Sequence, residues 1–292
     1  MASLRGVTEA LHISYDKLPE KTQKAARLFA FLSPDPVPLE IIGAVSGEVF
    51  APDARAALVT RSFVTQLPAG GTIPWFGRMH RVLADFLRSC SPDLEGEALM
   101  MCNGLTNVMQ PDACRDPKHW PLMNACLPHA EWLFGQLGAI KTREFGEAEI
   151  ALGLGVGILL LAEGFLARAR KTQELTLSFS QSLLGEEHPN TLTSMSNLAE
   201  TLRAQGELAG ARALHERVLE VRRRVLGEEH PDTSLSAWNL FLTLVQLNEI
   251  ATAKRIIHDR LRWLLERDPA TLDTNQQQIR KMLIGSHDAN EP

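Results

Sequence analysis

Apolar residues in the C-terminal half of the chain recur at helical spacing in two runs separated by a glycine. The first run includes Leu198 and Leu202, the second includes Leu208 and Ala211, and Gly206 stands between them. Spacings of three and four residues place these side chains on one face of a helix, and glycine permits the backbone conformation of a tight turn. The pattern predicts two amphipathic helices joined as a hairpin.

The hairpin pattern belongs to a repeat with a period of 42 residues. The segment L-G-E-E-H-P-N-T at residues 184–191 recurs at residues 226–233 as L-G-E-E-H-P-D-T. The apolar positions repeat with it, because Leu198 falls on Leu240 one period later and on Val156 one period earlier. The sequence therefore predicts at least three copies, each a helical hairpin.

Each copy carries residues typical of a helix start and of a tight turn. Pro189 and Pro231 suit a first helical turn, and a polar neighbour of each is expected to cap the helix. The candidate caps are His188, Asn190, His230 and Asp232. Asn248 stands where other copies have Gly164 and Gly206, so we expect the last turn to be looser.

The pattern resembles the tetratricopeptide repeat, whose basic period is about 34 residues. Its 42-residue form is similar to the repeats of kinesin light chains and of many bacterial signalling proteins. The resemblance covers residues 184–255 closely and residues 150–183 less closely, and most of the family's aromatic positions are aliphatic here. It implies an α-solenoid whose concave wall, formed by the first helices, holds an extended peptide.

By the family's pattern, the binding residues lie on the first helix of each copy. In the middle copy these positions are polar and suit hydrogen bonds to a peptide backbone; they are Thr193, Ser196, Asn197, Glu200 and Arg203. In the flanking copies they are mostly apolar; they are Leu154 and Ile158 on one side and Leu235, Trp238, Asn239, Leu242 and Val245 on the other. An exposed apolar strip of this length indicates a partner, a docked segment of this chain or a second copy. The alternative is that these leucines pack against adjacent helices.

The first 90 residues have a different pattern, with short helical segments and one hairpin signal. Two apolar runs, residues 62–67 and 72–76, flank a turn signal at Ala69, Gly70 and Gly71. Helices are expected at residues 7–16, 20–32, 38–45, 52–61 and 80–87. Helices around a small β-hairpin predict a winged-helix-like domain.

Four segments of this region carry a second resemblance; they are residues 13–19, 30–33, 58–64 and 79–87. In order and spacing they resemble the winged-helix part of NB-ARC-type (STAND) signal-transduction ATPases, which often continue into tetratricopeptide repeats. The resemblance implies that His80 approaches a nucleotide phosphate, although Arg81 stands where the best-known motif has an acid. No G-x-x-x-x-G-K-[ST] phosphate loop occurs in the chain, so we expect the nucleotide-binding domain to be missing and His80 to cap a helix. The chain would then be the C-terminal part of a larger protein or a stand-alone relic.

A winged helix also raises the alternative of a DNA-binding transcriptional regulator with the repeats as its sensor. Residues 1–90 carry 10 Lys and Arg against 8 Asp and Glu, and the candidate recognition helix at 52–61 offers only Arg55 and Arg61. Phosphate contacts need more basic side chains than this. A protein-packing winged helix is the favoured interpretation.

Other candidate chemistry is weak. Residues Cys114, His119, Cys126 and His129 are zinc-ligand types without a familiar zinc spacing, and the alternative is that Cys126 is a buried apolar residue. The glutamate pairs at 186–187 and 228–229 lie beside histidines, but as repeat linkers they are interpreted as solvated turns. With no nucleophile elbow and no H-E-x-x-H motif, we expect no enzyme, no cofactor and no metal site.

Composition agrees with a foldable, mainly helical protein of more than one part. The chain has 292 residues, of which 45% are hydrophobic, and a formal net charge of -5, which gives no general attraction to nucleic acid or anionic lipid. Its apolar run at 150–162 is short of the roughly 20 residues that span a bilayer. Four cysteines without a C-x-x-C pair are expected to be reduced thiols in a cytoplasmic protein.

These observations predict four parts, a fold and a function. The parts are a winged-helix-like domain at 1–90, a helical linker or degenerate repeat at 91–146, about three repeats at 147–270, and a capping helix with a disordered tail at 271–292. The fold class is mainly all-α with a small β-hairpin, followed by an α-solenoid. The expected function is a non-catalytic protein-interaction module, a sensor or scaffold part of a signalling protein, whose partner is a peptide, a second copy or a separate nucleotide-switch domain.

Overall fold

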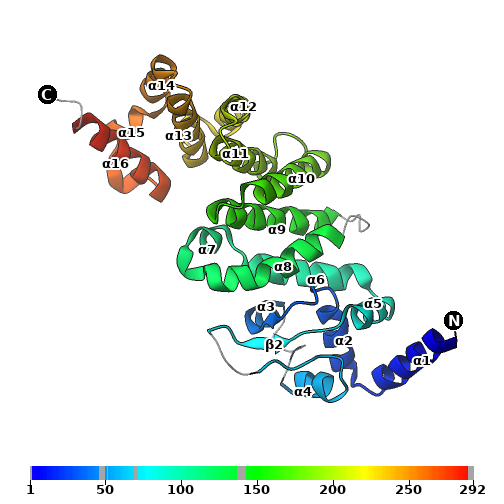
Figure 1. Ribbon diagram of the computed structural model, residues 1–292. Helices are drawn as coiled ribbons and strands as arrows, with labels where there is room; N and C mark the ends of the chain where they lie inside the picture. The colour runs from blue at the N-terminus through cyan, green and yellow to red at the C-terminus, as the bar shows by residue number, and fades with distance from the viewer. Residues whose placement is uncertain (1, 46–49, 51, 69–71, 137–142, 289–292) are drawn as a thin grey trace. The chain divides into compact units, whose positions relative to one another are not determined.

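The computed structural model describes residues 2–45, 50, 52–68, 72–136 and 143–288, in two compact units, Met1–Glu163 and Gly164–Pro292 (Figure 1). The four-part division expected from the sequence is finer than this one and stays a prediction. The helices of unit 1 are α1 Ala2–Asp16, α2 Glu20–Phe29, α3 Leu39–Val45, α4 Pro52–Thr60, α5 Arg81–Ser89, α6 Leu94–Val108, α7 Pro111–Arg115, a 3-10 turn Pro117–His119, α8 Trp120–Gln136 and α9 Arg143–Ala162.

The small sheet of unit 1 joins segments that are distant in sequence. Strands β1 (Val37–Pro38) and β2 (Trp75–Gly77) pair antiparallel, with Val37 opposite Gly77. Phe76 of β2 is buried and contacts the rings of Phe29 and Phe50, with centroids 5.1 and 5.6 Å away. Burial of this aromatic cluster favours the long-range pairing.

The hairpin expected from residues 62–67 and 72–76 forms only in part. Thr65 makes an isolated bridge with Arg78, through hydrogen bonds of 2.8 and 3.1 Å, while β1 is the ladder partner of β2. The expected turn at 69–71 lies outside the described residues. Gly77 explains the close approach, because it has φ +150 and a Cβ there would lie 2.4 Å from the Val64 side chain.

Buried polar contacts tie the helices of unit 1 together. Arg27 on α2 forms a 2.8 Å ion pair with Glu97 on α6 and donates to the Tyr15 hydroxyl at 2.6 Å. Both members of the ion pair are buried, so removing either one would leave an uncompensated charge. The expected short helices are present as α1 to α5, and helix α2 ends at Phe29, earlier than the expected 32.

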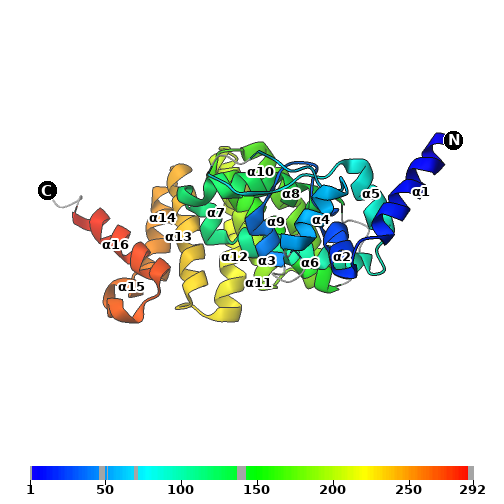
Figure 2. The ribbon, with the colours of Figure 1, turned by 90° about the horizontal axis from the view of Figure 1, so that it is seen from below.

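Unit 2 is a series of antiparallel helices (Figures 1 and 2). They are α10 Leu166–Leu184, α11 Pro189–Ala204, α12 Leu208–Leu226, α13 Pro231–Gln246, α14 Ile250–Ile256, a π-helix Ile257–Leu261, α15 Trp263–Glu266, a 3-10 turn Pro269–Thr271 and α16 Thr274–Asp288. Each of α11, α12 and α13 packs against the helix before it. The predicted fold class, mainly helical with a small sheet and a repeat solenoid, is confirmed.

The structure identifies the caps and corrects one expectation about the turns. His188 and His230 are the N-caps, because their Nδ1 atoms accept from the amides of Asn190 and Asp232. Asn248 was expected to loosen its turn, but it adopts the left-handed conformation, with φ 61. The amide of Glu249, the next residue, donates to the Leu244 carbonyl at 2.9 Å. In the preceding copy the amide of Glu207 donates to the Leu202 carbonyl in the same way, so the turn is unchanged. Asparagine tolerates this conformation better than most residues, which explains the result.

The hairpin that begins with α13 contains one residue more than the hairpin of α11 and α12. Its second helix is interrupted by the π-helix, where the amide of Arg262 donates to the carbonyl of Ile257, five residues earlier. A π-helix accommodates one inserted residue within a helix. In agreement, α16 begins 43 residues after α13, and its buried Gln276, Ile279 and Leu283 stand 43 residues after buried Thr233, Ser236 and Leu240. Helix α16 therefore occupies the place of the first helix of a fourth copy.

Among the described residues, the structure has no helix that is both long and apolar enough to cross a membrane.

Candidate functional site

The predicted binding residues of unit 2 lie on two first helices, α11 and α13. Ten of them recur on these helices at equivalent positions 42 residues apart, from Thr193 and Leu235 to Arg203 and Val245. Nine are half-buried and Val245 is 41% exposed. We call the surface formed by these ten residues the first-helix face.

Helix α11 gives this face a charged cluster. Oε2 of Glu200 accepts a 2.6 Å hydrogen bond from Nη2 of Arg203. Oε1 of Glu200 lies 3.3 Å from Nε2 of His215 on α12, at ion-pair distance but without hydrogen-bond geometry. Burial by itself would raise the pKa of Glu200, but His215 and Arg203 together lower it. The carboxylate therefore stays ionised.

The side-chain amide of Asn197, also on α11, has an unused hydrogen-bond donor. Nδ2 of Asn197 is buried and has no hydrogen-bond partner among the described residues. A buried donor without a partner costs free energy, which a bound acceptor can recover. Because the residue as a whole is half-buried, a change of side-chain rotamer would bring this donor to a bound peptide carbonyl.

The sequence pattern missed Arg222, which lies between α11 and α13 although it belongs to α12. Its guanidinium donates to Oγ of Ser236 at 3.0 Å, to the carbonyl of Asp232 at 3.4 Å and to Oγ1 of Thr193 at 3.4 Å. The residue is 6% exposed and forms no ion pair with a carboxylate of any described residue. Burial lowers the pKa of Arg222, and the charge of Asp232 offsets only part of that effect. Arg222 is thus a desolvated cation held by neutral oxygens and one distant acid.

A signal for Arg222 and His215 was present in the sequence. Both occupy the helical face that carries Ala211 and Val218, where apolar residues are expected. A polar side chain in an apolar slot indicates a buried polar contact, and both residues make one.

Helix α13 supplies the apolar part of the first-helix face. Leu235 and Leu242 are half-buried, whereas the ring of Trp238 stacks on that of Phe241, with centroids 5.0 Å apart, and packs against the C-terminal core. Trp238 therefore has a packing role. Leu242 and Val245 keep apolar surface open to solvent.

The remaining two predicted residues lie on α9 in unit 1. Leu154 is half-buried, and Ile158 is 6% exposed and belongs to the buried hydrophobic residues. Whether either one binds a partner stays a prediction.

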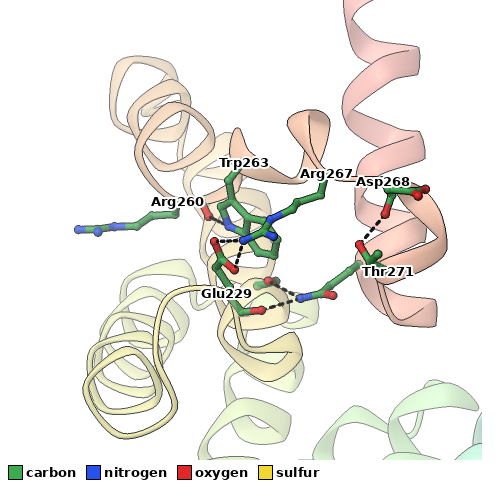
Figure 3. Close-up of polar contacts among 8 residues, drawn as sticks. Glu229, Arg260, Trp263, Arg267, Asp268 and Thr271 are labelled. Carbon is green, nitrogen blue, oxygen red and sulfur yellow. Dashed lines mark hydrogen bonds and ion pairs between the residues drawn. The ribbon is translucent and has the colours of Figure 1, made fainter.

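The linker glutamates, interpreted from the sequence as solvated turns, form ion pairs with the second helix of the hairpin that follows each linker. The pairs are Glu186 with Arg217 at 2.9 Å, Glu187 with Arg224 at 2.5 Å, Glu228 with Arg260 at 3.1 Å and Glu229 with Arg267 at 2.5 Å. Figure 3 shows Arg267 reaching Glu229 beside the ring of Trp263, whose indole N–H donates to the Arg260 carbonyl at 3.0 Å. The groups are largely exposed, so each pair adds little stability.

The other candidate groups have structural partners. His80 caps α5, its Nδ1 accepting from the amide of Val82 at 3.3 Å. Within the described part of the chain, no three His, Cys, Asp or Glu side chains gather as a metal site. All four cysteines are free, and burial raises the pKa of Cys102 and Cys126 to about 12 and that of Cys114 to about 11, which keeps these thiols protonated.

One serine and one histidine form a nucleophile-like pair in unit 1. Oγ of Ser33 lies 2.8 Å from Nδ1 of His129, whose Nε2 lies 3.0 Å from the Pro36 carbonyl. Ser33 is 4% exposed and His129 is fully buried. A substrate has no access to this pair, so its role is to attach α8 to the loop before β1.

Comparison with known proteins supports the repeat assignment. A family model described as tetratricopeptide repeat matches residues 191–232. That segment is 42 residues long, one full period, running from the start of α11 to the start of α13. The predicted tetratricopeptide repeats are confirmed there, and such repeats are in general protein-interaction modules.

Two solved structures are similar to this chain. One is a putative kinesin light chain with nearly identical tetratricopeptide-like repeats from Podosopora anserina, with 16% identity and a TM-score of 0.47, covering 73% of this chain and 86% of that one. The other is BtubC (BKLC) from P. vanneervenii, with 16% identity and a TM-score of 0.44, covering 70% of this chain and 87% of that one. A comparison with curated proteins finds no match.

Proposed function

We propose that the first-helix face of unit 2 binds an extended peptide segment of a protein partner. The observation that carries the proposal is that this face has both an unpaired hydrogen-bond donor and apolar surface open to solvent. Asn197 has an unpaired buried donor, and Val245 and Leu242 leave apolar surface open beside it on α13. A peptide backbone supplies acceptors at regular spacing, and its side chains supply apolar contacts.

The test uses a random 12-residue peptide library panned against the full chain. Selected peptides should bind the Leu242→Asp and Asn197→Ala variants at least about tenfold more weakly than the wild type, since a buried hydrogen bond or a covered leucine contributes on the order of 1–2 kcal/mol. Leu175→Asp is the matched control, because Leu175 is 52% exposed and lies on the second helix α10. Equal affinity for the wild type and Leu242→Asp would exclude this face.

We further infer that the chain acts as a non-catalytic sensor or scaffold part of a cytoplasmic signalling protein, with the parts at 1–90, 91–146, 147–270 and 271–292. The N-terminal part would be a winged helix that packs against a nucleotide-switch domain on another chain. Support comes from α5, which begins directly after His80, and from the resemblance of its residues to the family motif. Calorimetric titration with ADP should show no binding to this chain alone, and clear binding would contradict the proposal.

No observation favours DNA binding as a second candidate. Arg55 on α4 donates to the carbonyls of Phe76 and Trp75, at 2.7 and 3.2 Å, so one of the two arginines of the candidate recognition helix is engaged with β2.

A further inference from the structure

An apolar cavity of about 800 Å³ lies near the C-terminal end of unit 2, within the usual volume range of ligand sites. It is walled by α13, by α14 with the π-helix and α15, and by α16. Its apolar lining consists of Phe241, Val245, Ile250, Ile257, Leu265 and Leu283, with the small Ala253. Val245 and Ile250 are 41% and 43% exposed, so this apolar surface is open to solvent.

The charged part of the lining leaves one positive charge uncompensated. Lys254, His258 and Arg262 follow one another at intervals of four residues, and Arg262 pairs with Glu266 at 3.5 Å. Lys254 is exposed and forms no ion pair with any residue that the structure describes. The cavity therefore has an apolar floor and an unpaired ammonium group at its edge.

The two earlier copies show what this position does in the repeat. Lys254 stands 42 residues after Arg212 and 84 after Arg170. Each of these arginines pairs with the N-cap glutamate of the next second helix; the contacts are Arg170 with Glu207 at 2.5 Å and Arg212 with Glu249 at 2.6 Å. The position thus marks where one second helix receives the start of the next.

The third copy has lost the acid that its own helix would supply. Arg170 and Arg212 also pair with glutamates four residues later, Glu174 and Glu216. The residue four positions after Lys254 is His258, whose Nδ1 lies 2.8 Å from the neighbouring Asp259. In this copy, no acid at that spacing pairs with the cation.

Helix α16 leaves the side of the cavity next to α14 open. It takes the place of the first helix of a fourth copy and packs against α13 and α15. In the two preceding copies, a second helix packs along the first helix, as α12 does on α11 and α14 does on α13. Lys254 therefore lies where such a second helix would begin, and the apolar lining of the cavity lies beside that point.

We propose that this cavity docks an amphipathic α-helix of a partner protein, whose N-terminus lies where the second helix of a fourth copy would begin. Its apolar side covers Ile250 and Val245, and an acidic residue at its N-terminus pairs with Lys254. The cavity and the first-helix face share Val245. Variants of Leu242 and Asn197 therefore test the first-helix face, and a variant of Lys254 tests the cavity.

The probe is a synthetic peptide of residues 207–226, which contains the N-cap Glu207 and the sequence of α12, added to the full-length protein. We expect saturable binding by fluorescence anisotropy and a loss of roughly fivefold in the Lys254→Glu variant, as reversal of an exposed ion pair predicts. A peptide with Glu207→Lys should recover the loss on that variant. Lys171→Glu, at an exposed lysine of α10, should leave binding unchanged.

Three results would overturn the proposal. The first is no peptide binding to the wild type, and the second is binding that the Lys254→Glu variant leaves unaltered. The third is a wild-type dimer in light scattering that Lys254→Glu converts to a monomer, because the occupant would then be a second copy of this chain. Circular dichroism melting of each variant verifies that the exposed substitutions leave the fold intact.

Discussion

Arg222 is a buried cation at a position where the next copy carries an apolar residue. The equivalent residue of the next copy is Leu265, 43 residues later. The spacing is 43 and not 42 because the π-helix between them contains one inserted residue. Leucine therefore fits this position in a related hairpin. A desolvated charge without a carboxylate partner is a cost to the folded state, and proteins often tolerate its apolar replacement.

We predict that Arg222→Leu keeps the stability of unit 2 or raises it by about 1 kcal/mol. Ser236 and Thr193 remain hydrogen-bonded to the carbonyls of Asp232 and Pro189, at 2.7 and 2.9 Å, after the guanidinium is removed. Urea denaturation measures the stability. A loss of more than about 1 kcal/mol would show that the hydrogen bonds of Arg222 outweigh the cost of its burial.

Glu149 on α9 is a buried acid with a measurable effect on stability. Burial raises its pKa from 4.5 to about 7. Between these values the unfolded chain releases the proton while the folded one keeps it, so the stability of unit 1 should fall as the pH rises from 4.5 to 7.

The Glu149→Gln variant should therefore be more stable than the wild type at pH 8, by roughly 1–2 kcal/mol, since a neutral amide has no charge to bury at this position. The two proteins should converge at pH 4.5. Urea unfolding at both pH values tests this, with Glu9→Gln on an exposed part of α1 as the control. An equal gain at both pH values would show that ionisation of Glu149 is not the cause.

At the scale of elements, the π-helix preserves the repeat contacts in spite of an inserted residue. Ala253, before it, matches Ala211 at a spacing of 42 residues, and both are almost fully buried. After it, Arg260 and Arg267 stand 43 residues from Arg217 and Arg224 and make the equivalent ion pairs with linker glutamates. The π-helix thus accommodates the extra residue locally, and the residues on each side of it keep their repeat contacts.

Deletion of Asp259 should convert the π-helix into a continuous α-helix and change the stability by less than about 1 kcal/mol, because the residues on each side keep their partners. Deletion of Glu216 from α12 is the control. It rotates the rest of an uninterrupted helix by about 100° and misplaces Val218 and Leu219, which should cost several kcal/mol. Similar losses in the two deletions, measured by urea unfolding, would contradict this role of the π-helix.

The sequence was informative where a local pattern decides the structure. The L-G-E-E-H-P segments and the apolar spacing predicted the hairpins of unit 2, and the caps were among the named candidates. The first helix of a fourth copy was missed because α16 lacks that segment and starts 43 residues after α13. The partner of β2 was missed because tertiary burial of Phe76 selected β1 over the neighbouring segment.

The candidate site was predictable only at the level of helix faces. The periodicity placed ten residues on one face of α11 and α13, but it could not separate Trp238, which packs inward, from Leu242. Nor could it find Arg222, which reaches the junction from a different helix. Side chains that cross between elements depend on tertiary geometry, which a one-dimensional pattern does not contain.

For the whole molecule, the central claim is that a partner peptide lies along α11 and α13. Hydrogen–deuterium exchange of the full chain, with and without a peptide selected from the library, tests it most directly. The account predicts slower exchange at the first helices α11 and α13, with α10 and the helices of unit 1 unchanged. Protection confined to α14 and α16, to α10 or to unit 1 would contradict it.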